Sequence, residues 1–217
     1  MARWAVFDVD GTLLPGDSME ARFIKRSIRR GMISPAGFLG LLGNALKFFF
    51  RGNLAGGLKG DKSLLKGLPF SRVETEAAAC FSAEIAPRLS RLGRETVARC
   101  REEGCRILLM TGSPDFLARH LLPVLQPDQL ISAEMEIANG CFSGKVRGLH
   151  PYGEAKKNLL LRAQPQLQID FAGSVVYANH HSDAAHMELF GRAVAVNPGR
   201  QLKRIARARG WEIEYWG

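Results

Sequence analysis

Two aspartates near the N-terminus have the spacing of a reaction centre. An apolar run at residues 4–7 precedes Asp8 and Asp10, and a Gly11-Thr12 turn follows them. Such a run predicts a buried parallel strand, and ligands of open α/β sheets bind at the carboxyl ends of such strands. Alternation along a strand places both acids on the same side of the chain. One carboxylate could then attack a substrate while the other transfers protons or holds a metal ion. The alternative is a simple turn after a strand.

The composition is that of a globular protein. Of the 217 residues, 46% are hydrophobic and 24% are charged, which excludes the disordered, collagen-like and disulfide-scaffold classes. The 30 Lys and Arg exceed the 21 Asp and Glu, and this net charge of +9 favours an anionic partner without choosing its kind. The basic segment 201–209 alone does not predict nucleic-acid binding, because no base-stacking platform or motif accompanies it.

The four cysteines predict reduced thiols. Cys80, Cys100, Cys105 and Cys141 form no C-x-x-C pair, and the N-terminus opens into a core strand without a signal peptide. We therefore expect a cytoplasmic protein.

From residue 90 onward, strand-like and helix-like segments alternate. We expect strands at 105–110, 129–132, 175–178, 193–196 and 212–215, helices at 91–103, 115–125, 155–162 and 201–209, and a hairpin turn at Asn139-Gly140. This order predicts an α/β fold with a parallel sheet wrapped by helices. The segment between the first strand and residue 89 is helix-like throughout. The predicted architecture is thus a Rossmann-like core of residues 1–15 and 90–217, with an all-helical cap of residues 16–89 inserted after the first strand.

One stretch of the predicted cap is strongly apolar. Residues 38–50 include Phe48, Phe49 and Phe50, but Asn44 and Lys47 interrupt the run. It is shorter than the roughly 20 apolar residues that a membrane span needs. We expect a buried or substrate-facing helix here, and a membrane-surface anchor is the alternative.

Four motifs in this order resemble those of the haloacid dehalogenase superfamily, in the branch with a helical cap that includes phosphoserine phosphatase. Residues 8–12 (DVDGT) resemble the first motif, 111–113 (TGS) the second, 152–156 (YGEAK) the lysine motif and 177–183 the fourth. The resemblance covers nearly the whole chain. It implies a Mg²⁺-dependent phosphomonoester hydrolase that acts on a small phosphorylated metabolite through an aspartyl-phosphate intermediate.

The resemblance also implies a role for each motif. Asp8 would attack phosphorus, and Asp10 would protonate the leaving oxygen and later activate water. Lys156, rather than its neighbour Lys157, would neutralise the phosphoryl group and Asp8. The remaining phosphate-binding groups would be the Thr111 hydroxyl, the Gly112 backbone N–H and Ser113.

The implied magnesium site departs from the family pattern at one position. Its ligands would be Asp8, the carbonyl of Asp10, Asn179 and Asp183, and Asn179 stands where the family has an acid. An amide oxygen can bind Mg²⁺ but brings no charge, so Asp183 should matter more, either as a ligand through water or as a residue that holds the ligands in place. A phosphate-binding or regulatory protein of the same fold, catalytically weakened at this position, is the alternative.

Three histidines surround the fourth motif. His180, His181 and His186 could indicate a transition metal, because imidazole suits Zn, Ni, Cu or Fe better than Mg. The other interpretation is polar loop groups beside a phosphate.

The predicted cap bears on the substrate. Asp17 matches in charge the acid that phosphoserine phosphatases place nine residues beyond the nucleophile, whereas Asp61 stands where they have a carboxylate-binding arginine. We therefore expect a substrate other than phosphoserine, although Lys62 could compensate. A phospholipid headgroup phosphatase at a membrane surface is a further alternative, and the sequence does not determine the oligomeric state.

Overall fold

The computed structural model describes residues 1–33 and 61–217. The apolar stretch at 38–50 lies outside these residues. None of the helices within the two described ranges is long and apolar enough to cross a bilayer.

The centre of the molecule is a six-stranded parallel sheet in the order β3-β2-β1-β6-β7-β8. The predicted parallel α/β fold is thus confirmed. The strands are β1 (Trp4–Asp8), β2 (Arg106–Pro114), β3 (Gln129–Ala133), β6 (Val175–Ala178), β7 (Arg192–Val196) and β8 (Glu212–Glu214). Because the chain goes from β1 to β2 on one side and later to β6 on the other, the strand order reverses at β1. Open α/β sheets bind their ligands at this point.

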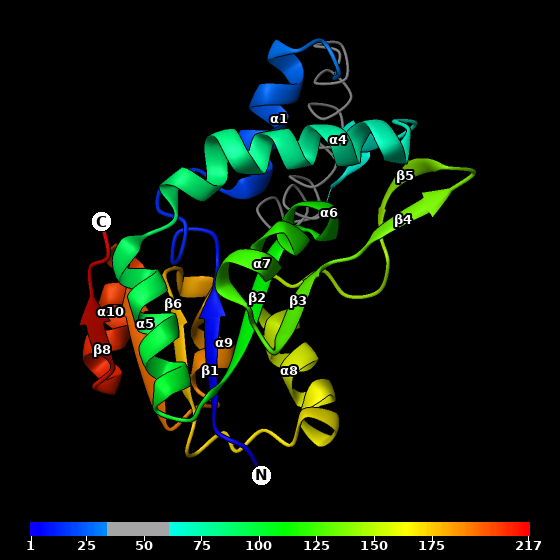
Figure 1. Ribbon diagram of the computed structural model, residues 1–217. Coiled ribbons are helices and arrows are strands. Elements are labelled where there is room, and N and C mark those ends of the chain that lie inside the picture. The colour runs from blue at the N-terminus through cyan, green and yellow to red at the C-terminus, as the bar shows by residue number, and fades with distance from the viewer. Residues whose placement is uncertain (34–60) are drawn as a thin grey trace.

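Two hydrophobic clusters cover the two faces of the sheet. Alternate residues of β1 divide between them, with Phe7 in one cluster and Trp4 and Val6 in the other. The Phe7 cluster includes residues of α5 (Arg91–Glu102), and the Trp4 cluster includes residues of α8 (Glu154–Leu167), α9 (Ala184–Met187) and α10 (Arg200–Arg209). The core therefore has three layers, with the sheet between two sets of helices (Figure 1).

Two helices differ from their predicted extent. The helix expected at 115–125 is three short pieces, α6 (Asp115–Ala118), a 3-10 turn (Arg119–Leu121) and α7 (Leu122–Leu125). Pro123 lies in the first turn of α7, where proline is tolerated but cannot donate the backbone hydrogen bond of a continuous helix. The helix α8 continues to Leu167 and contains Pro165.

The described part of the predicted cap lies beyond the carboxyl ends of the strands (Figure 1). It comprises α1 (Met19–Arg29), the 3-10 turn η1 (Ser63–Leu65), α4 (Phe70–Cys80), the π-helical turn η2 (Phe81–Ile85) and the 3-10 turn η3 (Ala86–Arg88). Ser18 caps α1, since its hydroxyl accepts a hydrogen bond from the Ala21 N–H at 3.1 Å.

A hairpin from the core reaches these helices. The strands β4 (Met135–Ala138) and β5 (Cys141–Val146) pair antiparallel around the predicted Asn139-Gly140 turn. Phe142 exchanges backbone hydrogen bonds with the segment before α4, donating to Leu68 at 3.0 Å and accepting from Gly67 at 2.8 Å. The ring of Phe116 in α6 packs against Phe142 of β5 and against Phe23 of α1, with 5.3 Å between the ring centroids in both pairs. Aromatic contacts thus join the helices to the core.

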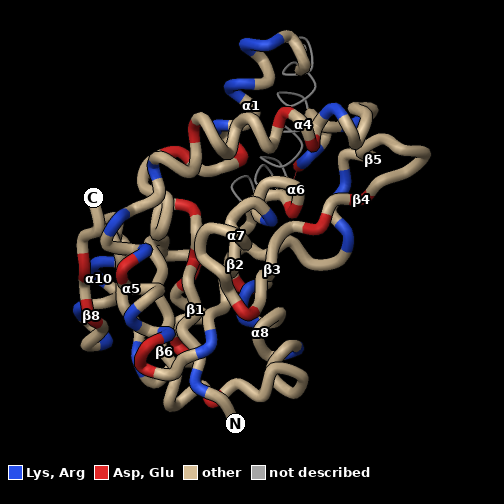
Figure 2. The backbone as a smooth tube through the Cα atoms, in the orientation of Figure 1, with Lys and Arg blue, Asp and Glu red and all other residues tan. Residues whose placement is uncertain are grey.

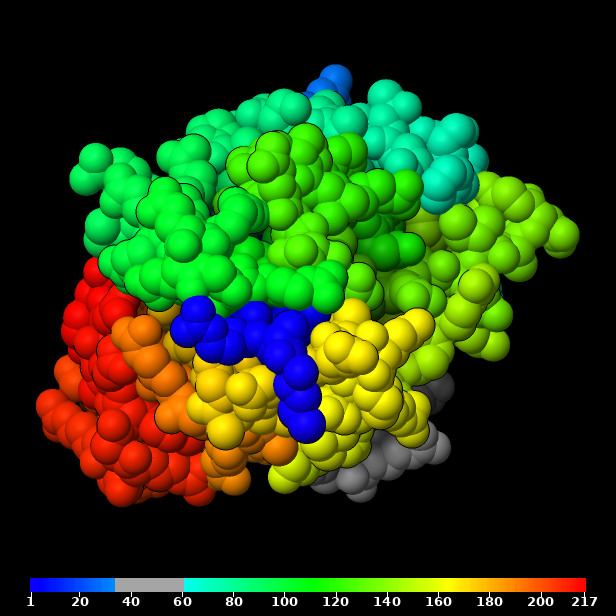
Figure 3. All heavy atoms as spheres, turned by 60° about the horizontal axis from the view of Figure 1, so that its bottom comes forward, coloured from blue at the N-terminus to red at the C-terminus, as the bar shows by residue number. Residues whose placement is uncertain are grey.

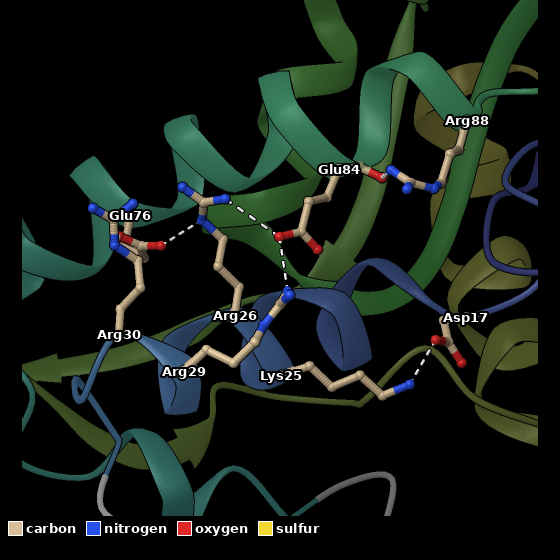
Figure 4. Close-up of polar contacts among 8 residues, drawn as sticks. All are labelled: Asp17, Lys25, Arg26, Arg29, Arg30, Glu76, Glu84 and Arg88. Carbon is tan, nitrogen blue, oxygen red and sulfur yellow. Dashed lines mark hydrogen bonds and ion pairs between the residues drawn. The ribbon is translucent and has the colours of Figure 1, made fainter.

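Ion pairs fix α1 against the helix beside it. Basic residues mark much of α1, and acidic residues mark the neighbouring α4 and η2 (Figure 2). Arg26 lies between Glu76 at 2.6 Å and Glu84 at 3.3 Å, and Arg29 adds a 3.0 Å contact to Glu84 (Figure 4). Because Arg26 and Glu76 are less than one-fifth exposed, these contacts are screened less than surface pairs.

The N-terminus lies at the end of the molecule opposite to α1 and α4 (Figure 1). Figure 3 turns the lower end of Figure 1 forward and shows the first residues at its centre, between segments of the core. Strand β1 therefore runs from this face toward the helices above the sheet and delivers Asp8 there.

Candidate active site

A cavity of about 130 Å³ opens at the carboxyl end of β1. Its walls come from the loops after β1 and β6, from the last residues of β2, from the start of α1, and from the segment before α8 together with the first turn of that helix. The lining residues are Asp8, Asp10, Ser18, Glu20, Gly112, Ser113, His150, Pro151, Tyr152, Lys156, Asn179, His180, Ser182 and Asp183. Six of the residues predicted at the site after the first aspartate therefore share this cavity with Asp8: Asp10, Gly112, Ser113, Lys156, Asn179 and Asp183.

Lys156 joins two buried carboxylates. Its Nζ lies 2.6 Å from Asp8 Oδ1 and 2.9 Å from Asp183 Oδ1, and all three residues are buried. Burial raises the pKa of Asp8 to about 7 although Lys156 opposes the shift. Burial also acts to raise the pKa of Asp183, but Lys156 holds that pKa below its usual value. A single ammonium group thus pairs with two carboxylates, so its positive charge does not fully compensate that of Asp8.

Asp10 is oriented by three donors. The hydroxyls of Thr111 and Ser113 each donate to Oδ2 at 2.8 Å, and the backbone N–H of Met19 donates to Oδ1 at 2.8 Å. Thr111 is fully buried and also accepts from the Ser113 N–H at 3.0 Å. The structure thus differs from the expectation for Thr111, because its hydroxyl holds Asp10 and does not line the cavity.

The turn after β1 brings Asn179 close. Gly11 has a φ of +88°, and a Cβ at this position would lie 1.9 Å from Asn179 Nδ2. Only glycine leaves room for the amide and adopts this backbone conformation at low cost. Next to it, Thr12 donates to Asp8 Oδ2 at 2.9 Å. Thr12 is a site residue that was not among those predicted, and its place in the DVDGT motif is the sequence signal for it.

The donor set fits a hard divalent cation. Asp8 and Asp183 offer carboxylate oxygens, Asn179 offers an amide oxygen and Asp10 a backbone carbonyl, and oxygen ligands of this kind suit Mg²⁺. Such an ion would supply the positive charge that is lacking beside Asp8.

The described histidines do not form a metal centre of their own. Among the described residues, no group of three or more His, Cys, Asp or Glu side chains is arranged to hold a metal ion. His180 lines the cavity and shares a 2.8 Å hydrogen bond with Ser182, whereas His181 is exposed. His186 is buried with Nδ1 3.8 Å from Asp183, and burial lowers its pKa to about 3.

Two predicted substrate-binding residues lie outside the cavity. Asp17 is half exposed and pairs with Lys25 at 2.6 Å (Figure 4). Asp61 accepts a hydrogen bond from the Ser63 N–H at 2.9 Å and does not line the cavity. In their place, Glu20 of α1 reaches the cavity and pairs with the buried Lys62 at 2.5 Å. Sequence reasoning missed Glu20, since no motif marks it.

Comparison with known proteins identifies the family. The family model for haloacid dehalogenase-like hydrolases matches residues 5–188. The chain belongs to this family. It is therefore a hydrolase by family, and it carries the predicted Asp8 and Asp10 at the end of the first strand.

Several relatives are named as phosphatases. The chain is 26% identical over 214 residues to "Phosphoserine phosphatase SerB1" of Mycobacterium tuberculosis, covering 96% of this chain and 69% of that protein. It is 25% identical over 223 residues to "Histidinol-phosphatase" of Neisseria meningitidis, covering 98% of both.

Solved structures share the fold. A protein of unknown function from Bordetella pertussis matches with a TM-score of 0.81 at 24% identity, covering 99% of this chain and 98% of that one. A phosphoserine phosphatase solved as a phospho-aspartyl intermediate analogue matches with a TM-score of 0.69 at 19% identity, covering 100% and 94%.

Proposed function

We propose that the protein is a phosphatase that hydrolyses a small phosphorylated metabolite through an aspartyl phosphate on Asp8. The observation that carries this proposal is the buried Asp8, held by Lys156 at 2.6 Å and Thr12 at 2.9 Å in a cavity that it shares with Asp10. The names of two relatives, a phosphoserine phosphatase and a histidinol-phosphatase, support the same reaction class.

The geometry supports a two-step reaction. In the first step an oxygen of Asp8 bonds to phosphorus, the ester P–O bond breaks, and Asp10 gives a proton to the leaving oxygen. In the second step Asp10 takes a proton from water, and that water's oxygen attacks phosphorus, which releases phosphate and frees Asp8. The donors from Thr111, Ser113 and Met19 keep Asp10 aimed during both steps.

The phosphoryl group needs positive charge around its oxygens. Lys156 supplies one charge, and Gly112 and Ser113 line the same cavity. A Mg²⁺ ion held by Asp8, Asp183, Asn179 and the Asp10 carbonyl would neutralise further phosphoryl charge.

We assign residues 16–89 to a cap that covers the cavity, because α1 contributes cavity residues and its first N–H binds Asp10. We assign the activity to the cytoplasm, which the four free cysteines support.

The substrate is not phosphoserine, because Lys156 is the sole lysine or arginine among the described lining residues and Asp8 and Asp183 engage it.

The test is phosphate release from a panel of phosphate monoesters and p-nitrophenyl phosphate, with Mg²⁺ and then with EDTA. Asp8→Asn should abolish turnover, whereas Asp17→Asn, outside the cavity, should retain it. Turnover by Asp8→Asn would refute the mechanism. Phosphate binding without turnover in the wild type would favour a weakened phosphate-binding protein, for which Asn179 in place of an acid is the supporting observation.

A further inference from the structure

The wall of the cavity formed by α1 carries an ion pair that the proposed reaction does not use. Glu20 lines the cavity, and its Oε2 contacts Lys62 Nζ at 2.5 Å. The Lys62 side chain is 1% exposed and the Glu20 side chain 22% exposed, so the carboxylate faces the cavity while the amine lies behind it. Burying a lysine has a high free-energy cost unless a partner compensates its charge. Glu20 therefore pairs with an amine that could otherwise have bound a substrate carboxylate.

The position of Glu20 places it on the side of the leaving group. The phosphoryl side of the cavity is marked by Lys156 and Asp183, which contact each other beside Asp8. Asp10, the proposed proton donor to the leaving oxygen, accepts a hydrogen bond from the N–H of Met19, the residue before Glu20. Glu20 and Asp10 both line the cavity, and the Met19 hydrogen bond ties Asp10 to the turn of α1 that carries Glu20. A group attached to the leaving oxygen would thus meet Glu20.

We propose that Glu20, held by Lys62, selects the leaving group by accepting a hydrogen bond from it. This inference rests on the proposed phosphatase function. The substrate class is a phosphate monoester whose leaving group carries an uncharged or cationic hydrogen-bond donor, a hydroxyl or an ammonium, close to the ester oxygen. A leaving group that carries a carboxylate or a second phosphate is disfavoured, because it would place a like charge against Glu20 and Asp10.

The test compares four esters of similar size. Ethanolamine phosphate carries an ammonium, ethylene glycol monophosphate a hydroxyl, propyl phosphate no donor, and 2-phosphoglycolate an anion. For the wild type, kcat/KM for at least one of the two donor esters should exceed that for propyl phosphate at least tenfold, and 2-phosphoglycolate should fall below propyl phosphate. The comparison of kcat/KM between ethanolamine phosphate and ethylene glycol monophosphate shows whether the site prefers an ammonium or a hydroxyl donor.

Glu20→Gln tests the residue itself. If Lys62 keeps its contact with the oxygen of the substituted side chain, the new amide nitrogen faces the cavity and offers a donor where there was an acceptor. The preference for donor esters should then fall at least tenfold, and the relative rate with 2-phosphoglycolate should rise. Glu95→Gln is the matched control, because it removes an exposed ion pair with Arg91 on α5. Its substrate preference should equal that of the wild type.

Lys62→Met separates a recognition role from a packing role. Without the lysine, Glu20 presents an uncompensated charge, so the preference for ammonium over hydroxyl should rise. Thermal melting shows which variants remain folded, and if Lys62→Met does not fold, Glu20→Gln alone decides. An unchanged order of the four esters in a folded Glu20→Gln variant would overturn the inference. Failure of the wild type to hydrolyse any monoester, p-nitrophenyl phosphate included, would instead overturn the proposed function.

Discussion

Replacement of Lys156 by methionine should cost both stability and rate. The amine contacts Asp8 at 2.6 Å and Asp183 at 2.9 Å, and methionine keeps much of the side-chain volume without the charge. Removing one partner of a buried ion pair typically costs about 3–5 kcal/mol of unfolding free energy. For a chain of this length each kcal/mol corresponds to roughly 2–4 °C, so we expect Tm to fall by roughly 6–20 °C.

The loss should depend on pH. The pKa of Asp8 is already raised to about 7 by burial, and removing Lys156 removes a charge that lowers it. At pH 5 Asp8 can take up a proton in place of the missing cation, whereas at pH 8 the carboxylate remains unpaired. The difference in Tm between wild type and Lys156→Met should therefore be larger at pH 8 than at pH 5. Both proteins are measured without metal.

The rate should fall by about 10²–10³ or more, the usual cost of losing one donor to transition-state charge. Lys157→Met is the matched control, because Lys157 is the adjacent residue of α8, is partly exposed and does not line the cavity. The assay is p-nitrophenyl phosphate hydrolysis with Mg²⁺, together with thermal melting. The reasoning is refuted if Lys156→Met stays within threefold of the wild-type rate, or if Lys157→Met loses as much.

Three further outcomes are expected. At pH 8, Mg²⁺ at 100 times its Kd should stabilise the fold by about 2.7 kcal/mol, roughly 5–11 °C in Tm. The same Mg²⁺ concentration should stabilise it less at pH 6, because a proton on Asp8 competes; equal shifts at both pH values would contradict this. Gly11→Ala should lower Tm and rate more than Gly140→Ala, since both have positive φ but only the Gly11 methyl meets Asn179, at 1.9 Å, whereas Gly140 has nothing within 4 Å. Asn179→Asp should lower the Mg²⁺ concentration for half-maximal rate, with each tenfold corresponding to about 1.4 kcal/mol; an unchanged or higher concentration would remove Asn179 from the proposed ligands.

The sequence predicts the central strands of the sheet well because β1 and β6 are buried on both faces. The run at residues 4–7 is fully buried, and Val175–Ala178 is the strand expected from its four apolar residues. In a parallel sheet the carboxyl ends of adjacent strands meet at one edge, so residues that follow different strands come together. This brings Asp8 and Asn179 to one cavity although they lie far apart in the sequence.

Which side chains reach the cavity depends on local geometry that motif spacing does not determine. The side chain of Ser18 turns inward to cap α1, and Asp17 before it lies outside the helix and pairs with Lys25. The acid that reaches the cavity is instead Glu20, in the first turn of the helix. The same limit applies to Thr111, whose hydroxyl could face a phosphate or Asp10 according to a side-chain rotation that spacing does not determine.

The start of α1 links the cap to the proposed chemistry. Ser18 caps the helix, the N–H of Met19 donates to Asp10, and Glu20 lines the cavity. Three consecutive residues thus fix the helix, orient the proposed acid and form the wall beside it. A displacement of α1 away from the core would break the Met19 hydrogen bond and leave Asp10 held by Thr111 and Ser113 alone. In the structure α1 lies where Asp10 has all three of these donors, so under the proposed cap assignment any movement of this helix would also change how the acid is held.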